Sequence, residues 1–248
     1  MKPGKRHGSA LSRRFQELML QLARQARGDL EKVPRHSRRA IHALRTRMKK
    51  LAAIIRLVKS HLPEPTRRAM LDSAKRLKKA FAAQRDAQVA DEMGFAGATP
   101  KTRRTPAPLF DEAARLTSLL TAATLDGLTR DEVREAYIGT YRAGRKRMKA
   151  CLDDPDPARL HAWRKPVKEL YYQSLALHQA PGMARRMRRA RRLGRWLGRD
   201  HDWQAIIERQ PRAAKNIARK RARLRRRIFT LAHKLYAAGP KKLGRKLA

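Results

Sequence analysis

The segment IHALRTRMKKLAAIIRLV, residues 41–58, decides the fold class, because its apolar residues recur at spacings of three and four. That period places them along one side of an α-helix. The same period recurs in LHAWRKPVKEL, residues 160–170, and over most of the chain, while runs of alternating β-branched residues are absent. The apolar positions of the first segment are Ile41, Leu44, Met48, Leu51, Ile55 and Val58. The sequence therefore predicts an all-α protein built from long antiparallel helices.

Glycine, proline and short polar runs divide the chain into about eight predicted helices. Asp156 followed by Pro157 is typical of an N-cap residue with proline at the first helical position. The segment 94–107 is the longest predicted loop, and it holds three basic residues and no acidic one, so it is either a linker or a loop that touches phosphate. The predicted helices cover residues 10–28, 36–61, 65–93, 108–125, 130–152, 157–179, 182–208 and 212–238.

The charge of the chain points to a polyanionic partner. The 248 residues include 62 Lys and Arg against 21 Asp and Glu, a formal net charge of +41. Solubility alone needs a net charge of only about 2–8. A fold this basic repels itself, and a bound polyanion relieves that repulsion. The expected partner is nucleic acid, polyphosphate or an anionic membrane surface.

Other features of the composition exclude several classes of protein. The chain is 42% hydrophobic, which suffices for a buried core. No apolar run approaches the roughly 18 residues of a membrane-spanning helix, and the first residues lack the apolar stretch of a secretory signal. With Cys151 as the only cysteine, a disulfide framework is excluded, and a reducing cytoplasm is the simplest compartment.

The two quoted segments belong to an internal repeat. Residues 41–51 match 160–170 at an offset of 119, and AKRLKKAFAAQRDAQ, residues 74–88, matches ARRLGRWLGRDHDWQ, residues 190–204, at an offset of 116. The repeat predicts two related four-helix units, over about 10–125 and 130–238, with a pseudo-twofold axis as a plausible relation. Together they form one domain over 10–240, between a basic extension at 1–9 and a basic tail at 241–248.

The repeat places cations on matched helix faces. Residues separated by three, four or seven positions share one face of a helix, so each half presents a His-Arg-Lys face and, on a following helix, a second basic face that ends in aspartate. These faces predict a groove lined by hydrogen-bond donors in each half. The faces comprise His42, Arg45, Lys49 and Arg56; His161, Arg164, Lys168 and Tyr172; Lys75, Lys79 and Asp86; and Arg191, Arg195 and Asp202.

At these residues the chain resembles the CHAD family, the conserved histidine α-helical domain. The motif His-x-x-Arg-x-x-x-Lys occurs at 42–49 and 161–168, and each copy is followed by a basic helix that ends in Arg-Asp or His-Asp. The resemblance covers about residues 10–240. It implies two four-helix bundles that bind inorganic polyphosphate in the cytoplasm and associate with its granules. The ligand-facing positions that it implies are His42, Arg45, Lys49, His161, Arg164, Lys165 and Lys168, followed by Lys75, Lys79, Arg191 and Arg195.

Three residues in the second half depart from the expected pattern. Pro166 stands inside the predicted helix 157–179, where proline removes a backbone hydrogen bond and costs about 3 kcal/mol if uncompensated, so we expect a kink. Gly194 and Gly198 lie within the predicted helix 182–208 and are expected to loosen it.

The residue types suit a phosphate chain. Arginine forms paired hydrogen bonds to phosphate oxygens, lysine supplies a compact charge, and histidine donates from both nitrogens only when protonated. We therefore expect tighter binding at pH 6 than at pH 8. Asp86 and Asp202 carry the wrong charge for an anion ligand, and we interpret them as caps or as partners that orient a neighbouring cation.

A binding protein without catalytic activity is the leading hypothesis, and two alternatives stay open. The first is a general nucleic-acid-binding protein, which the basic residues after Glu208 would permit. The second is a polyphosphate hydrolase. The sequence argues against it, because it contains no phosphate loop, no HExxH motif and no clustered carboxylates. Asp200-His201-Asp202 suggests a metal only weakly, and no cofactor is expected.

Overall fold

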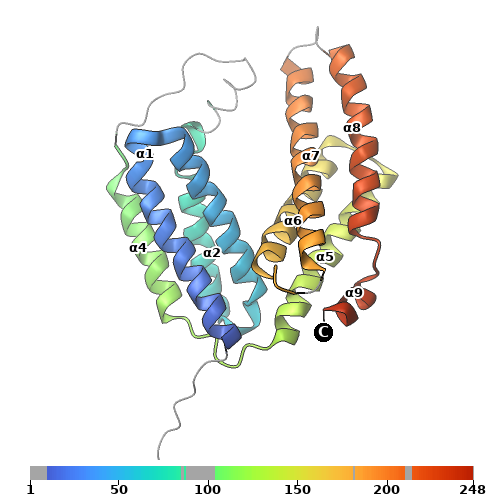
Figure 1. Ribbon diagram of the computed structural model, residues 1–248. Helices are drawn as coiled ribbons and strands as arrows, with labels where there is room; N and C mark the ends of the chain where they lie inside the picture. Colours follow the sequence, from blue (N-terminus) through green and yellow to red (C-terminus); the bar gives the residue numbers. More distant parts are fainter. Residues whose placement is uncertain (1–9, 85–86, 88–103, 181, 210–213, 248) are drawn as a thin grey trace, which may run out of the picture. The chain divides into compact units, whose positions relative to one another are not determined.

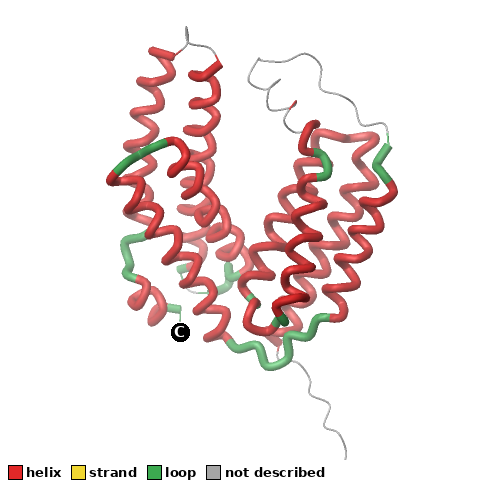
Figure 2. Tube along the Cα trace, turned by 180° about the vertical axis from the view of Figure 1, so that it is seen from behind, coloured by secondary structure: helices red, strands yellow, loops and turns green. Residues whose placement is uncertain are grey.

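The computed structural model describes residues 10–84, 87, 104–180, 182–209 and 214–247. Throughout these residues the backbone consists of helices and connecting loops, and no strand occurs among them (Figure 2). The prediction of an all-α protein is confirmed. None of the helices in the described ranges is long and apolar enough to cross a membrane.

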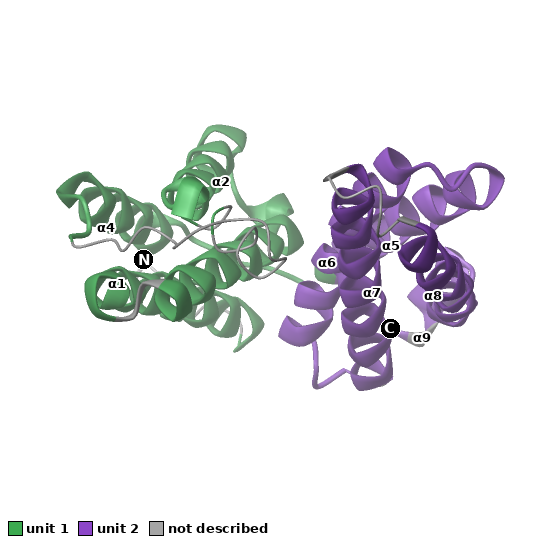
Figure 3. Cartoon of the chain, turned by 90° about the horizontal axis from the view of Figure 1, so that it is seen from above, with its two compact units in different colours: residues 1–133 green, residues 134–248 purple. Residues whose placement is uncertain are grey.

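The chain divides into two compact units (Figure 3). Unit 1 comprises residues 1–133 and unit 2 comprises residues 134–248. The division falls within the first turn of α5 (Arg130–Asp153), close to the boundary that the internal repeat predicts. Each unit has its own apolar core and its own set of polar contacts between helices, and each is described separately below.

The first helix of unit 1, α1 (Ala10–Leu57), folds back on itself (Figure 1). A straight helix of this length would span about 70 Å. The Arg47 guanidinium instead contacts both Asp29 and Gln25, with 2.5 Å between Nε of Arg47 and Oδ2 of Asp29. The direction of the chain therefore reverses between Asp29 and Arg47, around Pro34, whose missing N–H makes it a site where a helix bends. The predicted break at 28–36 is a helical corner instead of a loop.

The remaining helices of unit 1 are η1 (Lys59–His61), α2 (Glu64–Lys79) and α4 (Ala107–Ala122), and α1, α2 and α4 pack on one another. The apolar stripe of residues 41–58 forms the centre of the core, as predicted, and Phe15, Met70, Leu77 and Leu116 complete it with at most 1% exposure. Glu112 of α4 accepts hydrogen bonds from Ser73 and Arg76 of α2, which fixes these two helices in register.

The second predicted basic helix of the first half is shorter than expected. We predicted one helix over 65–93, whereas α2 ends at Lys79 and a turn follows at Ala80 and Phe81. Residues 82–84 are helical again. Asp86 and residues 94–103 of the predicted loop 94–107 lie outside the described residues.

Unit 2 contains most of α5, together with α6 (Pro157–Ala176), α7 (Met183–Arg209), α8 (Ala214–Leu235) and the short α9 (Pro240–Lys246). Asp156 caps α6 as predicted, because its side chain accepts from the backbone N–H of Arg159. Helix α6 continues through Pro166 without a break. The residues after Pro240, predicted as a basic tail, include α9, whose Leu243 is fully buried.

A buried ionic cluster joins α7 to α8. Asp200 is 1% exposed and receives Nε of Arg221 at 3.0 Å and Nε of Arg225 at 2.9 Å. Arg221 also donates to Oε1 of Gln204. The carboxylate is compensated by two guanidinium groups, whereas loss of Asp200 would leave the buried Arg221 without its counter-charge. Part of the basic sequence after Glu208 therefore has a structural role.

Candidate anion-binding site

The predicted cations of unit 2 gather where α6 meets α7. The rings of His161 and His201 lie 4.5 Å apart, Arg164 lies against Gly198, and Lys168 lies against Gly194. Residue numbers rise along α6 while they fall along α7, so the two helices are antiparallel here. The His-Arg-Lys face of α6 thus runs along α7, and the structure brings His161, Arg164 and Lys168 together on it.

Two glycines of α7 make room for this arrangement. A methyl group at Gly198 would lie 3.0 Å from Nη2 and 3.2 Å from Nε of Arg164, and one at Gly194 would lie 3.4 Å from Cγ of Lys168. Both glycines are buried and four residues apart, hence on one helix face. We expected them to loosen the helix, which stays a prediction; the structure adds that they let two long cationic side chains lie across α7.

Burial of these cations changes their titration. Burial and, to a smaller extent, the charge of Arg164 lower the pKa of Lys168 to about 8, against the opposing effect of Asp202. Burial also lowers the pKa of Arg164, while the electrostatic effects of Asp202 and Tyr172 act to raise it. A lowered pKa means that the protein environment disfavours the charged form of the side chain. The exposed Asp202 therefore compensates only part of the positive charge on this face.

Two nitrogens of this face lack a hydrogen-bond partner in the part of the chain that the structure describes. Nδ1 of His161 and Nε of Arg164 are buried atoms without a hydrogen-bond partner among the described residues. Burial, followed by His201, Arg164 and Lys165, lowers the pKa of His161, so its imidazole is mostly neutral at pH 7. An anion in contact with this face would supply acceptors and would favour the charged form of each group.

The other predicted residues of unit 2 lie around this centre. Asp202 and the buried Tyr172 influence Arg164 electrostatically, and the orienting role predicted for Asp202 stays a prediction. Lys165, Arg191 and Arg195 are exposed. The register of α7 places Arg191 and Arg195 on the side that carries Gly198 and Asp202, but no described contact joins them to Arg164 or Lys168.

The corresponding face of unit 1 is arranged differently. Nη1 of Arg45 donates to the backbone carbonyl of Lys78 at 2.9 Å, so this guanidinium is held at the end of α2. Burial lowers the pKa of Lys78, as do the charges of neighbouring cations. These neighbours, in decreasing order of effect, are Arg45, Lys79, Arg56 and Lys75. Four of the predicted ligands of unit 1 therefore lie close to one another around a lysine that the prediction did not include.

The repeat gives no signal for Lys78. This lysine occupies the position equivalent to Gly194 at the offset of 116, next to the predicted Lys79. His42, Arg56, Lys75 and Lys79 are exposed, and Lys49 is partly exposed. Lys75 and Lys79 line an open hollow of about 380 Å³ together with Asp72, Arg76 and Ala80. The side chains of His42, Arg56, Lys75 and Lys79 are thus more exposed than those of Arg164 and Lys168 in unit 2.

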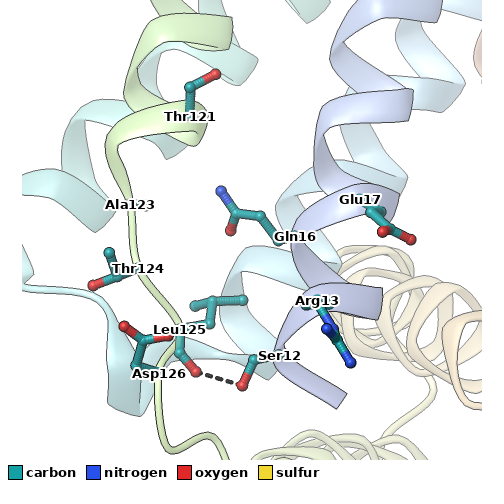
Figure 4. A pocket seen from close by; sticks show the side chains of 9 residues that line it. All are labelled: Ser12, Arg13, Gln16, Glu17, Thr121, Ala123, Thr124, Leu125 and Asp126. Carbon is teal, nitrogen blue, oxygen red and sulfur yellow. Dashed lines mark hydrogen bonds between the residues drawn. The ribbon is translucent and has the colours of Figure 1, made fainter. Parts of the chain in front are cut away.

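A second hollow of unit 1 has a different character. It lies between the start of α1 and the end of α4, measures about 370 Å³, and is crossed by the hydrogen bond from Ser12 to the carbonyl of Leu125 (Figure 4). Arg13, Glu17 and Asp126 line it, so charges of both signs meet there and a polyanion gains little. Within the described ranges, no group of three or more His, Cys, Asp or Glu side chains is placed to hold a metal ion.

Comparison of the chain with models of known protein families, with curated proteins and with solved structures finds no match. The resemblance to the CHAD family therefore stays a prediction that rests on the repeated His-Arg-Lys motif. The functional argument depends on the geometry of the two basic faces.

Proposed function

We propose that this protein binds inorganic polyphosphate through its basic helix faces and does not catalyse a reaction. The observation that carries this proposal is the half-buried cation pair Arg164 and Lys168 on α6, for which Asp202 is the nearby counter-charge. Taking a charge out of water costs free energy unless an opposite charge accompanies it. A multivalent anion would supply that charge from outside the protein.

A phosphate chain suits these faces better than a small anion. The cations recur at every turn of α6 and α7, so a linear ligand with regularly spaced oxygens can contact several of them at once. Arginine and lysine form charge-assisted hydrogen bonds that are about twice as strong as neutral ones. Simultaneous contacts on one chain act as linked binding events and raise the total affinity.

We further propose that the two units are copies of one four-helix arrangement. In unit 1 this would comprise the two arms of α1 with α2 and α4, and in unit 2 it would comprise α5, α6, α7 and α8. The proposal is supported by the order of the matched motifs and by the equivalent positions of Arg45 and Arg164 on the helices that carry them. A protein of this kind would be expected on polyphosphate granules in the cytoplasm.

A competition experiment tests the proposal. At moderate salt, long-chain polyphosphate should displace the protein from duplex DNA, while an equal phosphate concentration of DNA should not displace it from polyphosphate. The affinity should fall steeply with salt, because each neutralised phosphate releases condensed counterions. Displacement that is equally effective in both directions would instead support a general nucleic-acid-binding protein.

The non-catalytic part of the proposal has its own test. Purified protein incubated with polyphosphate and Mg²⁺ or Mn²⁺ should release no orthophosphate and leave the chain length unchanged on a gel. Protein-dependent shortening of the chain would contradict this part of the proposal and favour a hydrolase.

A further inference from the structure

Two tryptophans of α7 lie partly exposed beneath arginines. Cζ of Arg199 is 4.9 Å from the ring centroid of Trp203, and Cζ of Arg227 is 5.3 Å from that of Trp196. Both tryptophans retain partial exposure to solvent, and both arginines are exposed. The chain contains one further tryptophan, Trp163, which is fully buried. The core therefore accounts for Trp163 and does not account for the positions of the other two.

The two exposed tryptophans share one face of α7, and this face is not the one that meets α6. At 100° per residue, Trp196 and Trp203 are about 20° apart around the helix axis. Both are roughly 160–180° from the direction of Gly194 and Gly198, which face Lys168 and Arg164 of α6. Along the axis they are about 10 Å apart. Their face is thus separate from the candidate phosphate site.

Helix α8 borders this tryptophan face with a row of cations. Lys220, Arg223 and Arg227 are exposed and follow each other at spacings of three and four, so they lie on one side of α8. Because Arg227 lies over Trp196, that side of α8 adjoins the tryptophan face of α7. Contacts between Arg189 and Lys234 and between Gln204 and Arg221 show that the two helices run antiparallel along this border.

Aromatic rings beside a row of cations suit one class of ligand. Single-stranded nucleic acid offers flat bases, which stack on exposed indole rings, and phosphates, which pair with lysine and arginine. Arginine over an indole ring occupies the place that a base would take, and the guanidinium can stack on a base in turn. Polyphosphate has no bases and gains nothing from the tryptophans.

We propose that the α7–α8 face of unit 2 binds single-stranded nucleic acid by stacking bases on Trp196 and Trp203, while Lys220 and Arg223 hold the phosphates. The face shares none of these residues with the α6–α7 site, so this inference does not depend on the proposed polyphosphate function. Loss of one activity in a variant should leave the other unchanged.

The test compares two ligands of equal charge. Fluorescence anisotropy measures the affinity of the full chain for a thymidine oligonucleotide and for an abasic oligonucleotide of the same length, at about 0.3 M salt, where long-range attraction is screened. Stacking of one or two bases should make the base-bearing oligonucleotide bind about tenfold more tightly. Equal affinities for the two oligonucleotides would overturn the proposal, because charge alone would then explain binding.

Variants locate the effect. Trp203→Ala should reduce the preference for the base-bearing strand to about twofold and leave polyphosphate affinity unchanged, whereas Trp203→Phe should retain most of the preference because a ring remains. A full preference in folded Trp203→Ala would contradict the assignment. Because this variant removes a partly packed ring, circular dichroism and the melting temperature confirm its fold.

The phosphate contacts have a charge-matched control. Lys220→Gln with Arg223→Gln should weaken binding of both oligonucleotides by about tenfold, since each neutralised phosphate contributes to affinity and to its salt dependence. Lys146→Gln with Lys149→Gln removes two exposed cations of α5 and should have an effect of at most about twofold. Equal losses in the two double variants would show that only net charge matters and would overturn the assigned contacts.

Discussion

The His-Arg-Lys motif occurs once in each unit, but its side chains have different surroundings in the two copies. In unit 2, Arg164 lies across Gly198, and its Nε has no partner among the described residues. In unit 1, the equivalent Arg45 donates to the carbonyl of Lys78. The residue equivalent to Gly198 at the offset of 116 is Ala82. In unit 2 the glycine occurs together with an arginine that packs against the neighbouring helix α7. In unit 1 the alanine occurs together with an arginine that is held at the end of α2.

Because of this difference, the buried cations of unit 2 should affect the stability of the fold and the affinity for an anion in opposite directions. The half-buried Lys168 and Arg164 of unit 2 weaken the fold when no anion is bound, because burial disfavours their charges. The same burial strengthens their interaction with a bound anion, because the local dielectric is lower than that of water. The exposed cations of unit 1 are screened by solvent and contribute less per residue. We therefore expect unit 2 to supply most of the specific affinity for polyphosphate.

The largest expected effect comes from removing the central cations of one unit at a time. Arg164→Gln with Lys168→Gln should weaken polyphosphate binding about 100-fold, since two charge-assisted contacts of about 1.5 kcal/mol each are lost. Arg45→Gln with Lys49→Gln should cost about tenfold, because the cations beside them in unit 1, Arg56, Lys75 and Lys79, are exposed and remain to bind the anion. Isothermal titration calorimetry with long-chain polyphosphate measures both.

The control for this comparison is Lys146→Gln with Lys149→Gln on α5, which removes the same charge from an exposed surface. Its affinity should stay within about twofold of the unmodified protein. Equal losses in the two units would show that burial at the α6–α7 contact has no bearing on affinity.

The second effect tests the role of Gly198. Gly198→Ala should stabilise α7 by up to about 1 kcal/mol through helix propensity. The added methyl group would lie 3.0 Å from Nη2 of Arg164 and should displace this side chain, which lowers polyphosphate affinity about tenfold. Thermal melts and titrations on one preparation should therefore show opposite signs for stability and affinity.

Gly139→Ala is the matched control, because Gly139 lies within α5 and a methyl group there meets nothing within 4 Å. It should stabilise the protein by a similar amount and leave binding unchanged. If Gly198→Ala behaves like Gly139→Ala in both measurements, the glycine does not position Arg164.

The third effect is a loss of affinity between pH 7 and pH 9. The pKa of Lys168 is lowered by burial to about 8, so its amine is mostly charged at pH 7 and mostly neutral at pH 9 in the unbound protein. Binding at pH 9 then requires uptake of a proton, and affinity should fall about fivefold across this interval. Arg164 on the same helix and Asp202 on α7 are the charged groups that face this amine.

Lys168→Arg should flatten this pH dependence, because a guanidinium keeps its charge to above pH 12. A profile that is equally steep in Lys168→Arg would assign the effect to another group. Titration of His161 should add to affinity only in a more acidic range, because its pKa is lowered. Lys168 thus extends the pH dependence of polyphosphate affinity to higher pH than histidine alone would give.

The helices and their apolar stripes could be predicted from the sequence, because a period of 3.6 residues encodes both. Residues 41–58 and 160–170 pack as the pattern indicates, with Ile41, Leu51, Val167 and Leu170 fully buried. The corner near Pro34 was predicted as a break between two helices because sequence rules treat a glycine, here Gly28, as a helix end. They do not describe how a helical chain turns when the contact of Arg47 with Asp29 holds its arms together.

The residues that form the basic faces could be predicted only in part from the sequence. The spacing identified His161, Arg164 and Lys168, because side chains on one helix face follow from periodicity alone. It did not identify Lys78, or show that Gly194 and Gly198 accommodate the cations, since these facts depend on which faces of two helices meet. Arg221 and Arg225 belong to an excess of basic residues in the sequence and prove to be partners of Asp200.

Lysine footprinting tests the central claim most directly. The protein is acylated briefly at pH 8 with and without saturating long-chain polyphosphate, and mass spectrometry measures the extent of labelling at each lysine. We predict that polyphosphate protects Lys168 most strongly and Lys75 and Lys79 less, while Lys146 and Lys149 on α5 are labelled as before. Equal labelling of Lys168 with and without saturating polyphosphate would contradict the assignment of the α6–α7 face as the binding site.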